Sequence, residues 1–193
     1  MTPLHAPRVD HWPPALRSAA VLTGTLVPCG PGLRPVSWPE SPATRCAAIG
    51  GLLAERYAAV EDTAAWIWGA SRSPGQPIRL VSLRGRAPAS FSIVSSEMPV
   101  LVSTFRLAPG DLVEVAGYRV SSRARTAFDL LRAPSEFTVA RRAACRLLFR
   151  SERGIAEQVA ERARQASRVD SGRAQARLRA LLADAAQPGA PPG

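Results

Sequence analysis

Residues 117–131 decide the fold, and they read Gly-Tyr-Arg-Val-Ser-Ser-Arg-Ala-Arg-Thr-Ala-Phe-Asp-Leu-Leu. The first residues have the period-two pattern of a strand, and Ser122 is of a type that caps a following helix. In that helix Arg125 and Asp129 lie four residues apart, so they share one face and can form an ion pair. Thr126 can hydrogen-bond to the preceding turn. We predict a structural polar latch at a strand-to-helix corner, made of Ser122, Arg125, Thr126 and Asp129.

The sequence before this corner predicts helices, a hairpin and then a sheet. Residues 1–13 lack periodicity and are expected to form a loose arm. Helices are expected at 14–22, 41–54 and 61–69, with a hairpin at 25–36 whose prolines make both strands edge strands. Strand-like runs separated by Gly or Pro occupy 78–83, 91–94, 100–105, 112–115 and 118–120. They predict a mainly antiparallel sheet of four or five strands.

The sequence after the corner is helical, with expected helices at 122–132, 138–149, 152–167 and 172–185. A Pro/Gly-rich tail at 187–193 is expected to be disordered. Strands and helices occur in separate blocks and do not alternate, which is typical of the α+β class. We therefore expect an N-terminal helix and hairpin, then the sheet, packed with the C-terminal helices.

The composition indicates a folded chain with a strong excess of positive charge. The 193 residues are 46% hydrophobic, and 25 basic residues against 15 acidic ones give a net charge of +10. All 25 basic residues are Arg, which reflects either selection for the guanidinium group or a GC-rich genome. Whatever its origin, the excess positive charge attracts polyanions. The excess is evenly spread, with 14 Arg and 9 acidic residues before Glu136 and 11 and 6 from there on, which disfavours a dedicated DNA-binding lobe.

The sequence contains no recognisable catalytic constellation. Its three cysteines are far apart, and its only histidines are His5 and His11, so the chain cannot build a structural zinc site by itself. Phosphate-binding loops, dinucleotide-binding motifs and Lys are absent. We predict a non-enzymatic protein with no metal and no cofactor. Sparse cysteines and the lack of a membrane-length apolar run predict a cytoplasmic protein that does not contact membranes.

Two helices carry features that could face a partner. In the helix at 138–149, Arg142, Arg146 and Arg150 recur at i, i+4 and i+8, opposite an apolar side of Ala140, Ala144, Leu147 and Leu148. Like charges at this spacing repel, so the stripe is a candidate acidic-partner face or an ordinary solvated face. In the helix at 61–69, two Trp rings point in nearly opposite directions. One ring could be partly covered in a core helix, or it could dock a partner.

The corner motif resembles the signature (T/S)-S-x-x-R-T-x-x-D-L-A of the AbiEi family, the antitoxin side of bacterial type IV toxin–antitoxin pairs. Residues 57–69 resemble that family's small-residue helix. Residues 22–28 and 42–45 resemble a winged-helix wing that leads into the second domain. The three stretches occur in the family's order, and the resemblance covers about residues 14–182.

The resemblance implies a winged helix-turn-helix that binds operator DNA and represses transcription, followed by a domain that supports neutralisation of a nucleotidyltransferase toxin. Only one short helix precedes the hairpin here, so the major-groove reader is incomplete. The expected domains are an arm with a degenerate winged-helix remnant at 1–40, an AbiEi-like antitoxin domain at 41–186 and the tail at 187–193. Candidate DNA contacts are Arg17, Arg34 and Arg45.

Three functional hypotheses follow. The first is an antitoxin or transcriptional regulator whose partners are operator DNA or a nucleotidyltransferase-type toxin. The second is an orphan protein-interaction module that has lost DNA binding. The third is a remnant of a nuclease or nucleotidyltransferase.

Overall fold

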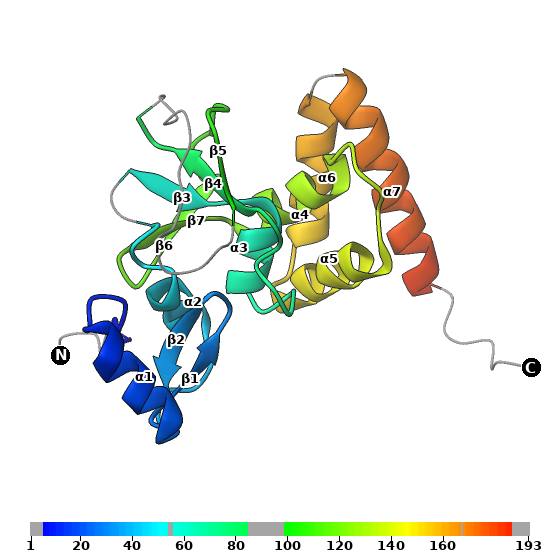
Figure 1. Ribbon diagram of the computed structural model, residues 1–193. Helices are drawn as coiled ribbons and strands as arrows, with labels where there is room; N and C mark the ends of the chain where they lie inside the picture. Colours follow the sequence, from blue (N-terminus) through cyan, green and yellow to red (C-terminus); the bar gives the residue numbers. More distant parts are fainter. Residues whose placement is uncertain (1–5, 54–55, 85–98, 167, 187–193) are drawn as a thin grey trace, which may run out of the picture. The chain divides into compact units, whose positions relative to one another are not determined.

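The computed structural model describes residues 6–53, 56–84, 99–166 and 168–186. The chain divides into two compact units, Met1–Ser122 and Arg123–Gly193. In the described residues, the first unit holds a helix, a hairpin, two further helices and a larger sheet, and the second holds helices only (Figure 1). This order confirms the predicted α+β class. The units meet in sequence at the predicted strand-to-helix corner, whereas the domain division at residue 40 stays a prediction.

The N-terminal part of the first unit is one helix and one hairpin. Helix α1 spans Pro14–Leu22. Strands β1 (Leu26–Cys29) and β2 (Gly32–Pro35) pair antiparallel around a two-residue connection. They form a sheet of their own, so both are edge strands, as their prolines predict.

The prediction of a loose N-terminal arm is wrong for residues 6–13. Val9 is buried in a small core with Ala20 of α1 and Leu26 of β1. Arg8 forms an ion pair with Asp10, and this contact lowers the pKa of Asp10. An irregular segment has no hydrophobic period, so the sequence pattern could not reveal that it packs. Residues 1–5 lie outside the described residues.

Helix α2 (Pro42–Ala48) begins with a capping box. The Ser41 hydroxyl accepts from the Thr44 amide at 3.3 Å, and the Thr44 hydroxyl accepts from the Ser41 amide at 2.7 Å. The helix ends earlier than predicted, since the Gly50-Gly51 pair that follows lies in a turn. Two glycines disfavour continued helix, although the apolar residues beyond Ala48 remain buried.

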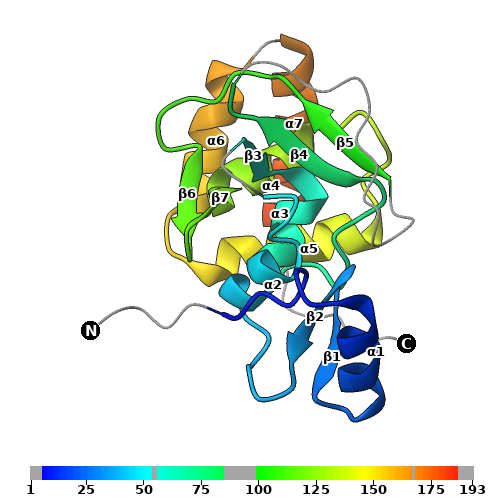
Figure 2. The ribbon, with the colours of Figure 1, turned by 60° about the vertical axis from the view of Figure 1, so that its left-hand side comes forward.

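The larger sheet has five strands in the order β5-β4-β3-β7-β6 (Figure 2). They are β3 (Tyr57–Ala59), β4 (Ile78–Ser82), β5 (Val100–Ser103), β6 (Leu112–Val115) and β7 (Tyr118–Ser121). The β3–β4 and β6–β7 pairs are antiparallel, whereas β3–β7 and β4–β5 are parallel. The sheet is therefore mixed rather than mainly antiparallel. Apolar alternation identifies a strand but does not give the direction of its neighbour.

Two differences from the predicted strands have different origins. The predicted strand at 91–94 lies outside the described residues. The central strand β3 was not predicted, because it is three residues long and contains two Ala, a poor strand former. Its pairing with strands on both sides, rather than its local sequence, fixes its conformation.

Helix α3 (Glu61–Ile67) covers one face of the sheet, where it contacts β4 and β7 (Figure 2). The core on this face also includes α2 and the end of β1. It contains Cys29, Cys46, Trp66, Ile67, Ile78 and Leu80. The opposite face has a smaller apolar cluster around Val60 and Val81. Ile78 and Leu80 share the first face while Val81 lies on the second, as the period of two requires.

The second unit contains four helices, each within a few residues of its prediction except for a late start of α6 and an early start of α7. They are α4 (Arg123–Arg132), α5 (Val139–Ser151), α6 (Ile155–Gln165) and α7 (Arg168–Ala186). Helix α4 contacts each of the other three (Figure 1) and is buried from Ala124 to Leu131. The tail at 187–193 lies outside the described residues.

The close approach of the hairpin to α2 gives a stability prediction. A Cβ at Gly32 would lie 2.0 Å from the Ala48 carbonyl oxygen, a rigid backbone atom. We expect Gly32→Ala to lower the free energy of unfolding by about 1–3 kcal/mol. The matched control is Gly172→Ala in α7, where the added methyl meets nothing within 4 Å. Because Ala favours helix over Gly, the control should raise stability by about 1 kcal/mol. Equal effects in urea unfolding would contradict the close contact.

Candidate partner-binding surface and nucleic-acid contacts

The predicted ion pair of the polar latch, between Arg125 and Asp129, is present at the start of the second unit, whereas the hydrogen bond of Thr126 to the preceding turn stays a prediction. The Arg125 Nε donates to Asp129 Oδ2 at 2.9 Å, and the Arg132 Nε donates to Asp129 Oδ1 at 2.8 Å. The Asp129 side chain is 0% exposed and that of Arg125 is 8% exposed. Thr126 is fully buried on the same helix, while the Ser122 amide donates to the Asp111 carbonyl at 2.8 Å. The prediction that the Ser122 hydroxyl caps the N-terminus of α4 remains untested.

Two arginines of α7 bind the backbone at the end of α4 and in the connection that follows it. Arg177 donates to the carbonyls of Leu131, Ala133 and Ser135 at 2.8–3.0 Å, and Arg173 donates to that of Arg132 at 2.8 Å. The Arg177 guanidinium also lies 5.0 Å from the centre of the Phe137 ring. Burial, with Arg173 and Arg141 nearby, lowers the pKa of Arg177. Both side chains therefore hold the end of α4 rather than facing a ligand.

The arginine stripe of α5 faces solvent. Arg142, Arg146 and Arg150 are exposed, and Arg146 donates to Asp184 of α7 at 2.8 Å. Among the described residues, neither Arg142 nor Arg150 pairs with a carboxylate. The side chains of these two residues remain available to a partner.

The apolar side of α5 is narrower than predicted. Ala144, Cys145 and Leu148 are buried, but Ala140 is exposed and Leu147 is 51% exposed. The buried face is centred on Leu148 and Cys145, so Leu147 lies toward the arginine stripe. Sequence alone gave no way to see which of two adjacent leucines faces the other helices.

A groove lies between α5 and α7, beside the stripe. It has a volume of about 320 Å³ and is lined by Arg146, Phe149, Arg150, Leu181 and Leu182. Leu182 is 45% exposed. Apolar side chains are thus accessible between two cationic ones, a combination that suits an acidic partner with an apolar anchor. The sequence pattern does not connect Leu181 and Leu182 with α5, because they lie more than thirty residues further along the chain.

The three candidate DNA contacts have different surroundings in the first unit. Arg45 pairs with Glu40, donates to the Trp66 carbonyl and lies 5.5 Å from the Trp66 ring centre. Its side chain is only 15% exposed. Arg34 donates to the carbonyls of Trp38 at 2.5 Å and Pro35 at 3.3 Å. Both guanidinium groups are engaged within the chain, which leaves Arg17 as the candidate with fewest contacts.

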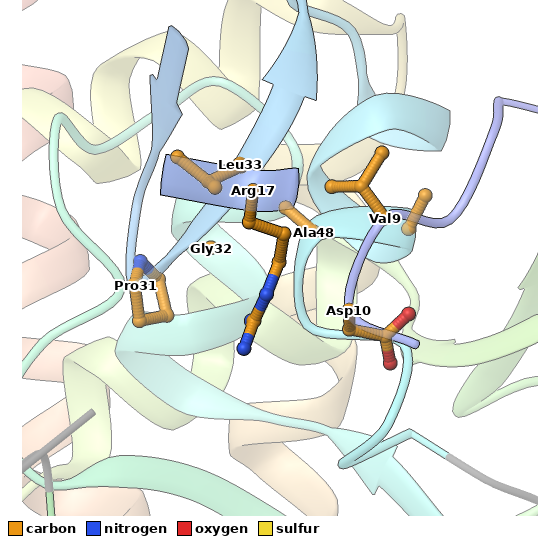
Figure 3. A pocket seen from close by; sticks show the side chains of 8 residues that line it. Val9, Asp10, Arg17, Pro31, Gly32, Leu33 and Ala48 are labelled. Atoms are coloured by element: carbon orange, nitrogen blue, oxygen red, sulfur yellow. The ribbon is translucent and has the colours of Figure 1, made fainter. Parts of the chain in front are cut away.

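Arg17 lines a pocket of about 260 Å³. Figure 3 shows it extending from α1 between the hairpin residues Pro31 and Gly32 and the arm residues Val9 and Asp10. Its Nε is buried and has no hydrogen-bond partner among the described residues. Asp10, whose carboxylate pairs with Arg8, brings negative charge to the same pocket, which disfavours a phosphate there.

The tip of the hairpin packs against the rest of the first unit. A Cβ at Gly30 would lie 2.5 Å from the Trp66 ring, and one at Gly32 would touch α2. A wing contacts DNA through its exposed tip or strands. Here one side of the tip packs against Trp66 and α2, while Gly30 itself is exposed. Trp68, which follows α3, is also engaged, since its ring nitrogen donates to the Ser121 carbonyl at 2.8 Å. Neither Trp66 nor Trp68 is therefore an exposed docking ring.

The described residues offer no catalytic cluster. Burial raises the pKa of Cys29 to about 11 and that of Cys46 to about 12, so both thiols are neutral and unreactive near pH 7. Cys145 is also buried. No group of three or more His, Cys, Asp or Glu side chains that could hold a metal ion occurs in the part of the chain that the structure describes.

Comparison with known families identifies the class of protein that this arrangement represents. Residues 57–184 match the AbiEi antitoxin C-terminal domain. The match covers the larger sheet, the latch and all four helices of the second unit, and more than half of the chain. The chain therefore belongs to the AbiEi antitoxin family, which confirms the resemblance drawn from the corner motif. No curated protein and no solved structure matched the chain.

In the described ranges, no helix combines the length and the apolar character needed to cross a membrane.

Proposed function

We propose that this chain is a non-enzymatic antitoxin that neutralises a nucleotidyltransferase-type toxin by presenting the basic face of α5 to a protein partner. The observation that carries the proposal is the exposure of Arg142 and Arg150, unpaired with any described carboxylate, beside an apolar groove. Membership of the AbiEi antitoxin family supports the antitoxin role in general. The two unpaired arginines suit an acidic partner surface, because positive charge on one side of an interface is stabilised by negative charge on the partner's side.

The distribution of charge between the two units supports the same proposal. Residues 123–193 contain 14 Arg and 7 acidic residues, whereas residues 1–122 contain 11 and 8. The excess is therefore concentrated in the helical unit when the chain is divided after Ser122, as the fold divides it, instead of before Glu136. A basic surface of this kind raises the rate of encounter with an acidic partner.

Operator binding is the second candidate, and it depends on Arg17, the candidate DNA contact with the fewest contacts within the chain, although Asp10 lines the same pocket. Arg34 and Arg45 are engaged within the chain, and one side of the hairpin tip packs against Trp66. One phosphate contact from Arg17 gives a slope of only about −0.9 in a plot of log affinity against log salt. A repressor built as a full winged helix would give a much steeper slope.

Co-expression tests the antitoxin proposal directly. We expect the neighbouring reading frame to encode a nucleotidyltransferase-type protein, and expression of that protein in a heterologous bacterium should arrest growth. Co-expression of this chain should restore growth to at least half of the uninduced rate. Growth that stays arrested while the chain accumulates to normal levels would overturn the proposal. A stable partner of another kind, co-purified from the native host, would then favour an orphan interaction module.

Operator binding is tested in parallel by a mobility-shift assay at several salt concentrations, with DNA from the region upstream of the gene that encodes this chain. Weak, nearly salt-independent binding is expected. Nanomolar binding that weakens with a slope of several phosphate contacts would instead assign repression to the chain.

A further inference from the structure

We propose that the groove between α5 and α7 binds an acidic amphipathic helix of a protein partner. This inference rests on the proposed function and specifies the chemistry of the surface that the partner presents. The groove is lined by the apolar side chains of Phe149, Leu181 and Leu182 and by the cationic side chains of Arg146 and Arg150. All five residues belong to one compact unit, so the groove needs no second element to complete it.

The apolar part of the surface continues beyond the groove along α5. Val139 is 72% exposed and Leu147 is 51% exposed. At about 100° per residue, Val139 lies over the arginine stripe, whereas Leu147 lies on the flank of the helix that points away from Phe149. Val139 therefore adds an exposed apolar side chain to the face that carries the arginines, as contact with an amphipathic helix requires.

The arginine spacing determines the charge pattern of the partner. Four residues of helix advance about 6 Å, so Arg142, Arg146 and Arg150 repeat at about that interval along α5. Carboxylates at i, i+4 and i+8 of a partner helix repeat at the same interval. Each can approach one guanidinium, and the planar fork of Arg suits a carboxylate in particular. The Arg146–Asp184 pair already shows one such contact, at 2.8 Å and at the surface.

A protein helix fits this surface better than a nucleic acid does. A phosphate backbone would satisfy the arginines but would leave the exposed side chains of Val139 and Leu182 against charged groups. These two apolar side chains therefore favour a partner that buries apolar surface as well as charge.

The test uses a synthetic helical peptide of about 20 residues, roughly five turns, with Glu at i, i+4 and i+8 and Leu on the adjoining positions. Its binding to the full chain is measured by fluorescence anisotropy. Arg142→Glu combined with Arg150→Glu should weaken binding about tenfold or more, and Leu182→Ser, at a half-exposed residue that lines the groove, should weaken it several-fold. The control, Arg119→Glu combined with Arg164→Glu, makes the same change in net charge at exposed residues that do not line the groove and should change binding less than about twofold.

Several outcomes would overturn the inference. They are no binding of the peptide, equal loss in the control variant, and undiminished binding of a peptide whose leucines are replaced by serine. Displacement of the peptide by a short DNA duplex, with duplex binding lost in the Arg142 and Arg150 variant, would assign the surface to nucleic acid. If the chain restores growth in the presence of the toxin but does not bind the peptide, the groove inference is wrong and the antitoxin role stands. If the chain binds the peptide but does not restore growth, the antitoxin role is wrong and the groove inference stands.

Discussion

Asp129→Asn is expected to lower the free energy of unfolding by about 3–5 kcal/mol. The Asp129 carboxylate is fully buried and accepts from both Arg125 and Arg132. The amide keeps the size of the side chain but removes its charge, so the Arg125 guanidinium is left buried without a counter-charge. Such an unpaired buried charge costs more than the pair contributes. Urea unfolding followed by circular dichroism measures the loss.

Asp184→Asn is the matched control, because it removes a carboxylate whose ion pair with Arg146 is exposed on both sides. An exposed pair contributes about 0–1 kcal/mol, so this variant should unfold almost as the wild type does. If both variants lose the same stability, the latch is an ordinary surface ion pair and does not hold α4 in place.

Trp66→Ala is the second substitution with a large expected effect, about 3–5 kcal/mol. The ring is 1% exposed in the core of the first unit. It also lies against Gly30 of the hairpin and under the Arg45 guanidinium. Removing it leaves a cavity and releases the hairpin tip.

Trp38→Ala provides the comparison for Trp66, since Trp38 is half-buried and lies outside the three apolar clusters. It should lose about 1 kcal/mol or less, as partly exposed positions do. Limited proteolysis adds a second measurement: cleavage in the hairpin should become faster in Trp66→Ala and remain unchanged in Trp38→Ala. Unchanged cleavage in both would show that the tip does not depend on the Trp66 ring.

The sequence predicted the elements whose signals are local. The latch follows from an i, i+4 pair after a strand, and α2 begins at Ser41 because a hydroxyl and a Pro occur in the first positions of a helix. The helices of the second unit follow from their apolar period. These features depend on residues within one or two turns of each other, which a single sequence displays.

The remaining features depend on distant partners. The short strand β3 exists because β4 and β7 pair with it on either side. The sequence predicts Arg45 as a DNA contact, whereas its guanidinium contacts the Trp66 carbonyl and ring. Arg177 binds carbonyls more than forty residues earlier in the chain. No local pattern indicates which of 25 arginines will reach such a partner.

The same limit applies to the candidate site. The stripe of Arg142, Arg146 and Arg150 was readable from its spacing, but the groove beside it was not, since Leu181 and Leu182 come from another helix. The fold also changed the interpretation of the charge. A boundary after Ser122 assigns twice as many Arg as acidic residues to the helical unit, whereas the sequence alone suggested an even spread.

The most direct test of the account compares two variants in the co-expression assay. Arg142→Glu combined with Arg150→Glu alters the exposed face of α5, and Arg17→Glu alters the remaining candidate DNA contact. Both variants should accumulate as folded protein, because Arg142 and Arg150 are exposed and Arg17 lies outside the apolar clusters of the first unit. We expect the α5 variant to lose rescue of growth and Arg17→Glu to keep it. Rescue that survives in the α5 variant and disappears in Arg17→Glu would contradict the account.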